Sequence, residues 1–533
     1  MTRPRAALLV LALWALSAPP AARAALDARA VAALAADETD DRIAALRALA
    51  AQGDAAAVPL LQAFADERLS VAAGRVLREE GGRVLDAATG APVEPAPAER
   101  ETLTVNNRLR RELASALAGL RLVDPDGAVR LAAARELAAA DDPELAPLLA
   151  RALAREKDAS VRAVLELTVA QTEVRSPDPA LRLAAVRTLG ASGSRTVLPV
   201  VEALLDPAVE RDAAVRAEAL VSTRLVRSRL AAGDFFGRVF SGVSLASILL
   251  LAALGLAITY GVMGVINMAH GEFLMVGAYS AHAMERLFAR VLPDHEAAYV
   301  LAAIPVAFAA AFAVGVAMER TVVRHLYGRP LETLLASWGV ALFLIQVARL
   351  AFGAQNVQVP NPGWMSGGIE PMTGFVLPWN RVVIIAFSLG VLAVVWVLLN
   401  RTRLGLFVRA VTQNRAMAGC VGVSTRRVDT LAFGLGAGVA GLGGVALSQI
   451  ANVGPEMGQS YIIDSFLVVV LGGVGQLAGA VWAALGLGIL SKFLEASAGA
   501  VVAKILILVL IVLVIQKRPQ GLFALKGRTV EGA

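Results

Sequence analysis

Three polar residues lie close together in an otherwise apolar stretch in the second half of the chain. Asn267, His270 and Glu272 belong to the run 261–273, GVMGVINMAHGEF. Polar and ionisable groups are costly inside a membrane, where they usually line a cavity or a solute pathway. Hydrogen bonding between packed helices is the alternative role. The spacing therefore makes these three side chains candidates for a translocation pathway.

The sequence offers little other reactive chemistry. Cys420 is the single cysteine, which excludes disulfide frameworks and CxxC metal or redox sites. The four histidines form no HExxH-type zinc cluster, and the chain has no GxxxxGKS or GxxxxGKT phosphate loop. We therefore predict that the chain is not an enzyme, and we expect no catalytic residue, metal site or cofactor.

Glycines interrupt the apolar runs in two places. Gly261 and Gly264 precede the polar residues, and Gly472, Gly473 and Gly475 form a second interruption. Glycine permits a broken membrane helix, whose free backbone groups are tolerated only against protein or water. We therefore predict broken helices at both places.

Two further features concern the predicted spans. Gly434 and Gly438 have the GxxxG spacing, which favours close helix packing over a ligand site. Asp464 and Lys504 lie near span ends, where charged side chains reach the membrane surface. We expect both to do so.

The composition is typical of a membrane protein. Of the 533 residues 57% are hydrophobic and 18% charged, and the region 25–235 holds 27 basic and 32 acidic residues against 20 and 12 for 236–533. Sparse basic residues between long apolar runs resemble cytoplasmic loops. A nucleic-acid face would instead combine basic with aromatic residues. We expect contact with membrane lipid and no nucleic-acid partner.

The second half contains apolar segments long enough to span a membrane, which takes about 20 residues. The predicted spans are 239–262, 264–288, 297–320, 331–352, 380–400, 428–452, 462–476, 478–495 and 496–516. We expect 462–476 and 478–495 to be half-length segments that meet at the glycines. Basic residues cluster at 320–329, at 401–427 and after 516, which predicts that these loops and the C-terminus are cytoplasmic.

Residues 1–24 have the features of an export signal. Arg3 and Arg5 precede an apolar stretch over 6–18, and 22–24 is a small-x-small cleavage site. An uncleaved anchor helix is the alternative. A periplasmic region that follows the signal, together with a cytoplasmic C-terminal tail at 526–533, requires an odd number of membrane crossings.

Residues 25–230 contain internal repeats with helical spacing. The run 124–137, DPDGAVRLAAAREL, matches 176–189, SPDPALRLAAVRTL, and 212–220 is a partial copy. Helical pairs that stack in this way resemble HEAT-type repeats. Arg130, Arg182 and Arg216 recur at the equivalent place, and we expect them to bind neighbouring turns. Residues 81–104 are expected to form an exposed loop.

The sequence thus predicts an all-α fold in two parts. An α-helical HEAT-like repeat domain at 25–230 precedes a polytopic α-helical membrane domain at 236–525, which the resemblance below implies to be a permease domain.

Three motifs carry a resemblance to a known family. The run 260–272, YGVMGVINMAHGE, closely resembles the opening signature of the branched-chain amino-acid permease family, the membrane subunits of ABC importers for amino acids, amides and urea. The run 471–480, LGGVGQLAGA, resembles that family's glycine turn, and 518–523, RPQGLF, its C-terminal tail. The N-terminal extension and the loop 359–368, VPNPGWMSGG, are similar to the urea-transporter permease subunit.

The resemblance implies a permease subunit of an ABC importer in the bacterial inner membrane. Its implied partners are a second permease subunit, two cytoplasmic ATP-binding subunits and a periplasmic solute-binding protein. The expected substrate is urea or a short amide, because an amino acid would need charge partners and an apolar pocket. A branched-chain amino acid is the alternative substrate, and a passive channel or a membrane-tethered scaffold are alternative functions.

The loop 401–427 resembles the coupling loop of ABC permeases. The pattern Ala416-x-Ala418-x3-Gly422 is similar to a degenerate form of the motif whose short helix docks on the ATPase, although its acidic first residue is absent. A solvated basic loop is the alternative. The candidate coupling residues are Arg409, Asn414, Ala416, Ala418 and Gly422.

Overall fold

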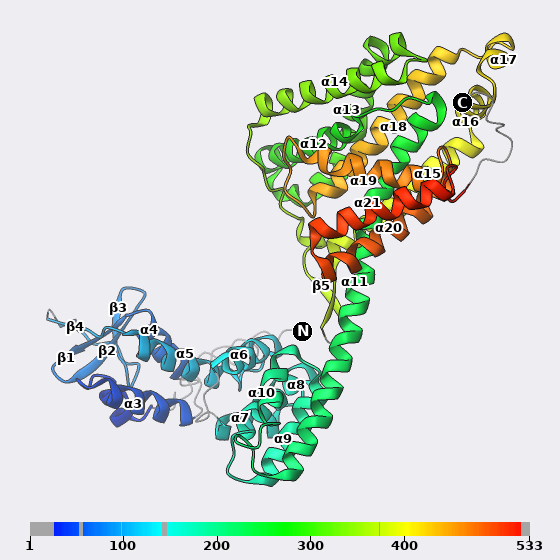
Figure 1. Ribbon diagram of the computed structural model, residues 1–533. Helices are drawn as coiled ribbons and strands as arrows, with labels where there is room; N and C mark the ends of the chain where they lie inside the picture. Colours follow the sequence, from blue (N-terminus) through cyan, green and yellow to red (C-terminus); the bar gives the residue numbers. More distant parts are fainter. Residues whose placement is uncertain (1–25, 53–56, 98, 141–145, 373, 524–533) are drawn as a thin grey trace, which may run out of the picture. The chain divides into compact units, whose positions relative to one another are not determined.

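The computed structural model describes residues 26–52, 57–97, 99–140, 146–372 and 374–523 (Figure 1). The chain forms two compact units, Met1–Leu230 and Ala231–Ala533. The predicted signal at 1–24 and the predicted tail at 526–533 lie outside the described residues.

Short helices make up most of the first unit. They are α2 (Ala28–Ala33), α3 (Thr39–Gln52), α4 (Ala57–Ala65), α5 (Asn107–Arg121), α6 (Gly127–Ala140), α7 (Ala146–Arg155), α8 (Ala159–Glu173), α9 (Pro179–Ser192), η2 (Arg195–Val197), α10 (Leu198–Ala203) and the first part of α11 (Ala213–Met263). Asn106, Asp158 and Asp178 begin α5, α8 and α9, and each side chain accepts a hydrogen bond from a backbone N–H in the first turn.

A small antiparallel sheet lies between α4 and α5. It contains β1 (Leu69–Ala72), β2 (Arg75–Glu80), β3 (Arg83–Asp86) and β4 (Glu101–Thr102) in the order β3-β2-β1-β4. Glu80 pairs with Arg83 across Gly81 and Gly82, whose φ angles are 59° and 78°. Two positive φ angles are what a two-residue hairpin turn requires. The prediction of a loop over 81–104 is therefore wrong at β3 and β4.

The second unit is a bundle of long apolar helices. It contains the rest of α11, α12 (His270–Val291), η3 (Pro293–Ala298), α13 (Tyr299–Thr321), η4 (Val323–Leu326), α14 (Pro330–Phe352), η5 (Gly363–Met365), β5 (Gly368–Met372), β6 (Phe375–Pro378), α15 (Trp379–Arg401), α16 (Arg403–Gln413), α17 (Arg415–Cys420), α18 (Thr425–Ser448), α19 (Met457–Gly472), α20 (Leu477–Ala498) and α21 (Ala500–Lys517).

Seven helices of the described chain are long and apolar enough to cross a membrane. They are α11, the continuous stretch η3–α13, α14, α15, α18, α20 and α21. This confirms the prediction of a mainly helical, polytopic chain. The predicted spans 264–288 and 462–476 are not among the seven. Helix α12 has 22 residues but carries Glu272, Glu285, Arg286 and Arg290, and α19 has only 16 residues. The expectation that 478–495 is half-length is wrong, since α20 has 22 residues.

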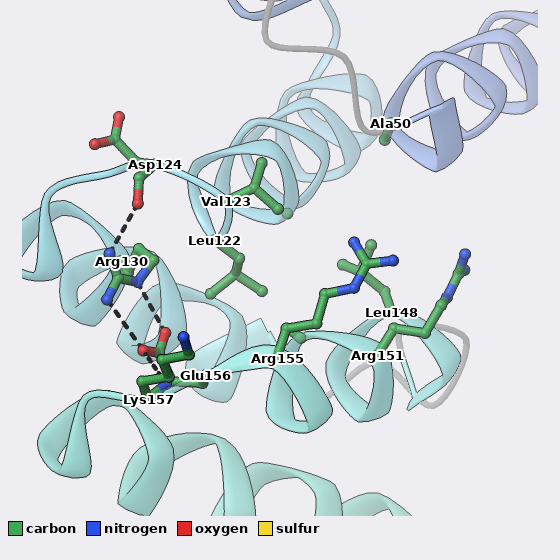
Figure 2. Close-up of a pocket in the computed structure, with 12 residues that line it drawn as sticks. Ala50, Leu122, Val123, Asp124, Arg130, Leu148, Arg151, Arg155, Glu156 and Lys157 are labelled. Atoms are coloured by element: carbon green, nitrogen blue, oxygen red, sulfur yellow. Dashed lines mark hydrogen bonds and ion pairs between the residues drawn. The ribbon is translucent and has the colours of Figure 1, made fainter.

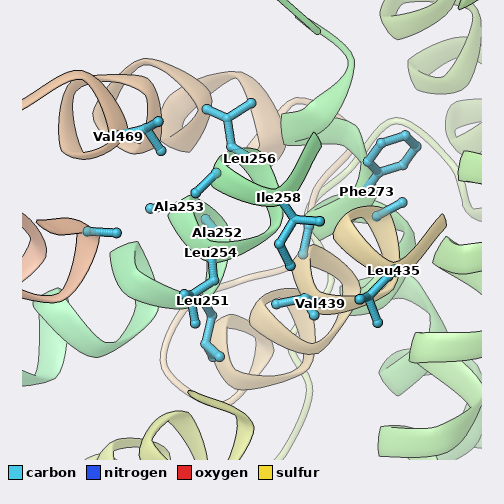
Figure 3. Close-up of a cluster of buried hydrophobic side chains, with 14 of the residues drawn as sticks. Leu251, Ala252, Ala253, Leu254, Leu256, Ile258, Phe273, Leu435, Val439 and Val469 are labelled. Carbon is cyan, nitrogen blue, oxygen red and sulfur yellow. The ribbon is translucent and has the colours of Figure 1, made fainter. Parts of the chain in front are cut away.

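Helix α18 lies at the centre of this unit and is buried along nearly all of its length. Figure 3 shows the apolar cluster around it, in which Leu435 of α18 lies with Leu251 of α11 and Phe273 of α12. Gly434 and Gly438 face the rings of Phe312 and Phe308 on α13, which confirms the predicted packing role of the GxxxG pair.

Candidate functional site

The polar run identified in the sequence lies at a break between two helices. Helix α11 ends at Met263, and the Gly264 N–H donates to the Tyr260 carbonyl oxygen at 2.9 Å. Gly264 has a φ of 66°, the left-handed conformation that commonly ends a helix at glycine. Gly261 remains helical and faces the backbone of Gly475. The chain is therefore broken at the first predicted place, at Gly264.

Asn267 organises the start of the next helix. Its Oδ1 accepts a hydrogen bond from the Ala269 N–H at 3.0 Å, and the neighbouring Met268 N–H donates to Ser337 Oγ of α14 at 3.0 Å. Asn267 is only 2% exposed, and its Nδ2 has no hydrogen-bond partner within the described part of the chain. The side chain thus stabilises the chain at the break through Oδ1, while its buried Nδ2 donates to no described residue.

His270 and Glu272 are buried in the first turn of α12. The Nε2–H of His270 donates to the Ala252 carbonyl oxygen of α11 at 3.0 Å, so the ring links the two helices across the break. His270 Nδ1 and Glu272 Oε2 are buried and make no hydrogen bond to any described residue. The structure therefore brings the three predicted residues together inside the subunit, and the His270 bond is of the helix-packing kind.

The second glycine interruption is a tight turn against the chain that follows α21. Gly473 and Gly475 have φ angles of 98° and 76° between α19 and α20. The Leu522 N–H donates to the Leu471 carbonyl oxygen at 2.8 Å. A side chain at Gly473 would collide with the carbonyl oxygen of Phe523. The two runs 471–480 and 518–523 are thus in contact, which the sequence did not reveal.

The predicted coupling loop folds as two short helices, α16 and α17. Asn414 caps α17, because its Oδ1 accepts from the Met417 N–H at 2.9 Å, and Gly422 follows α17 with a φ of 88°. Ala416 is exposed, whereas Ala418 is buried in the apolar core of this chain. Ala418 therefore cannot form the contact surface that the sequence analysis expected of it.

Side chains from other helices fix this loop. Arg415 forms an ion pair with Asp429 of α18, and its guanidinium lies 4.1 Å from the ring centre of Tyr327. Apolar side chains nevertheless remain exposed on α16, α17 and the residue after it, which is unusual for polar loops outside a membrane. They are Leu406, Phe407, Met417 and Val421.

Three of the predicted site residues line one cavity of about 450 Å³. Gly261, Arg409 and Gly475 line it, together with Trp396 of α15 and Gln476. The Arg409 guanidinium donates to the Leu399 carbonyl oxygen at the end of α15. The predicted coupling loop and the two glycine interruptions thus line the same cavity of the second unit.

The repeat arginines of the first unit make equivalent contacts. Arg130 Nε and Nη2 donate to the Glu156 carboxylate at 2.8 and 3.0 Å, while Nη1 donates to the Asp124 and Pro125 carbonyl oxygens. Arg182 repeats this with Glu210, at 2.7 and 2.9 Å. Hydrogen bonds from Arg130 lower the pKa of Glu156 to about 2. The expectation that these arginines bind neighbouring turns is confirmed.

A groove lies beside each of these ion pairs. The first, of about 510 Å³, is lined by Leu122, Leu148, Arg151, Arg155 and Lys157 near the Arg130–Glu156 pair (Figure 2). The second, of about 670 Å³, occupies the corresponding place beside Arg182 and Glu210. Since both repeats carry one, the grooves follow from the repeat geometry and do not mark a unique site.

Comparison with known proteins places the second unit in a family. Residues 238–515 match the family described as branched-chain amino acid transport system permease component. The chain is 30% identical to the high-affinity branched-chain amino acid permease LivH of Salmonella typhimurium, over 54% of this chain and 95% of LivH. It is 29% identical to BraD of Pseudomonas aeruginosa, over the same shares of the two chains.

A weaker similarity, 28% identity over 134 residues, connects 23% of the chain with 42% of the ribose import permease RbsC of Escherichia coli. No solved structure matches the chain. These relatives are transport subunits and not enzymes, and none of these names supports the urea substrate that the sequence analysis favoured. The chain belongs to the branched-chain amino acid transport permease family.

Proposed function

We propose that this chain forms the membrane path of an ABC importer for branched-chain amino acids. The observation that carries the proposal is the similarity to LivH and BraD, which extends over 95% of each relative. Both relatives are named for the transport of branched-chain amino acids. The urea assignment depended on the N-terminal extension, on one outer loop and on the expected lack of charge partners for an amino acid, and neither of these relatives is named for urea. The amino-acid alternative therefore replaces it.

The proposal includes an ATPase that drives transport from outside this chain. No phosphate-loop motif occurs in the sequence, so the energy has to come from two ATP-binding partner subunits. The exposed apolar side chains Leu406, Phe407, Met417 and Val421 offer them a contact surface. A second permease subunit and an external solute-binding protein complete the proposed importer.

The proposed orientation places the α16–α17 loop and the C-terminus in the cytoplasm. The basic residues at 401–427 and after α21 support this, since cytoplasmic loops carry an excess of lysine and arginine. Residues 25–230 then form a HEAT-like domain in the periplasm of a bacterial inner-membrane protein. A reporter enzyme that works only in the cytoplasm can be fused after Arg229. Activity of this fusion would contradict the proposed orientation.

Transport by the complete importer in proteoliposomes tests the substrate and the energy source together. We expect import of labelled leucine that requires hydrolysable ATP, and no import of labelled urea. Urea import without leucine import would refute the amino-acid assignment but not the family. Leucine import with a non-hydrolysable ATP analogue would instead indicate a passive channel.

A further inference from the structure

A cavity of about 290 Å³ opens between α11, α19, α20 and α21 of the permease unit. Aliphatic side chains form most of its wall, among them Leu249, Ile463, Leu467 and Leu508. Its volume is at the lower end of the range for small-molecule sites. The cavity is therefore suited to a small solute with an apolar part.

An ion pair stands in the wall of this cavity. Lys504 Nζ of α21 lies 3.6 Å from Asp464 Oδ2 of α19. This separation is longer than the 2.7–2.9 Å of a closed charge-assisted hydrogen bond. The Lys504 ammonium group and the Asp464 carboxylate can therefore each form a further hydrogen bond to another partner. Asp464 and Lys504 thus face each other in the wall of the cavity, while the expectation that both side chains reach the membrane surface stays a prediction.

The environment of the pair limits what can cover this face. The Lys504 side chain is 61% exposed and that of Asp464 30% exposed, although both belong to helices in the membrane part of the chain. Charged groups are costly against lipid and in membranes mark solute pathways or contacts with protein. The face that carries the cavity therefore points to a pathway or a partner subunit, and not to hydrocarbon.

We propose that this cavity binds the amino acid as it crosses the membrane, an inference that rests on the proposed function. Asp464 receives the α-ammonium group, and Lys504 receives the α-carboxylate. The branched side chain lies against Leu249, Ile463 and Leu467. When a zwitterion inserts between Asp464 and Lys504, each of the four charges has an opposite charge beside it. This pairing is needed because an unpaired charge is costly in a weakly hydrated site.

The two charges also give the site its selectivity. Urea is neutral and can offer Asp464 and Lys504 only hydrogen bonds, whereas a zwitterion replaces one charge contact with two. Selectivity comes from such a difference in binding free energy between solutes. The cavity is thus expected to accept aliphatic α-amino acids and to exclude neutral amides.

Substrate protection of an engineered cysteine tests binding directly. In the assembled importer with Cys420→Ser, Ser491→Cys places a thiol in the cavity, and Ser497→Cys on the same helix serves as a control outside it. We expect leucine, but not urea, to slow the reaction of the Ser491→Cys thiol with a small charged thiol reagent at least threefold. Lys504→Met should abolish this protection. The Ser497→Cys thiol should react at the same rate with and without leucine.

Transport by charge variants separates a binding site from a merely structural ion pair. Lys504→Met and Asp464→Asn should each lower leucine import by about tenfold or more, because each removes a charge-assisted contact. The double variant should remain equally impaired. The control is Lys492→Met with Glu495→Gln, which removes an ion pair of 2.6 Å on α20 outside the cavity and should import normally.

The outcomes distinguish the inference from the function on which it rests. Wild-type import of leucine combined with full activity of the double variant would overturn the binding site, since mutual neutralisation would then be the only role of the pair. Absence of leucine protection in an importer that transports leucine would overturn it as well. Import of urea in place of leucine by the wild-type complex would instead refute the proposed function.

Discussion

The backbone N–H of Leu522 donates a hydrogen bond to the carbonyl oxygen of Leu471, at 2.8 Å. This bond ties the segment after α21 to the end of α19. Gly473 makes it possible, because its φ of 98° turns the chain and its missing side chain admits the carbonyl oxygen of Phe523. Two motifs that are about 40 residues apart in the sequence therefore act as one structural element.

Gly473→Ala should destabilise the permease unit. The substitution forces alanine into the left-handed region and brings its Cβ against Phe523, at a cost of about 1–3 kcal/mol. Thermal unfolding of the purified protein in detergent measures the loss. Gly499→Ala is the control, because Gly499 has a φ of 81° but no atom within 4 Å of the added Cβ. An equal loss in both variants would show that the packing against Phe523 contributes nothing.

Gly277→Ala should destabilise the same unit through helix packing. Its Cβ would collide with the carbonyl group of Gly441, so α12 and α18 would have to move apart at a cost of about 1–3 kcal/mol or more. Gly486→Ala on α20 meets no atom within 4 Å and should be neutral or stabilising by up to about 1 kcal/mol. Urea or thermal denaturation in detergent compares them. A neutral Gly277→Ala would contradict the close contact of the two helices.

The pH dependence of the repeat unit should follow Glu156. Arg130 lowers the pKa of this carboxyl group to about 2, below its usual value near 4.5. A lowered pKa in the folded state stabilises the fold above the unfolded-state value, and this stabilisation disappears as the pH falls from about 4.5 to about 2. Hydrogen exchange of α6 and α8 in the full chain should therefore accelerate over this range, beyond the intrinsic effect of pH.

Glu156→Gln should remove that part of the pH dependence and give faster exchange already at neutral pH. Glu136→Gln, on the exposed side of α6, is the matched control and should behave as wild type. A Glu156→Gln profile parallel to that of wild type would show that the Arg130–Glu156 ion pair does not stabilise these helices.

Patterns within a few residues predicted the local contacts of the repeat arginines. The arginine of each repeat returns to carbonyl oxygens five and six residues earlier, as at Arg182 with Pro177 and Ser176. Such contacts are fixed by the local chain path and are visible in the spacing. The hairpin at Gly81 and Gly82 was missed because two glycines are a signal for a turn whether or not strands flank it.

Contacts between distant helices could not be predicted in the same way. Asp464 and Lys504 are 40 positions apart, and whether they meet depends on how α19 and α21 are rotated about their axes. The burial of Ala418 has the same origin, because it depends on how α17 packs on the unit. The order of residues along one helix does not determine how that helix is rotated against its neighbours.

The exposed apolar residues of the α16–α17 loop should carry the contact with the ATPase. Met417 is 60% exposed, so Met417→Asp should change stability by no more than about 0.5 kcal/mol while it weakens ATPase association and lowers import. Ala418→Phe should instead reduce stability, since Ala418 is buried. Co-purification of the ATPase together with thermal unfolding distinguishes the two effects. Normal association and import with Met417→Asp would place the docking surface elsewhere.

Asn267 allows its packing role to be separated from a role in transport. Its Oδ1 accepts the Ala269 N–H at 3.0 Å, whereas its buried Nδ2 donates to no described residue. Asn267→Ser keeps an oxygen that can accept from the backbone, and Asn267→Leu removes it, which should cost about 1 kcal/mol. If the amide only holds the break between α11 and α12, import per folded importer should be the same in both variants. We expect this outcome, because Asn267 is buried and is not among the residues that line the charged cavity. Leucine import that falls in both variants at unchanged stability would instead assign the free Nδ2 to the solute path.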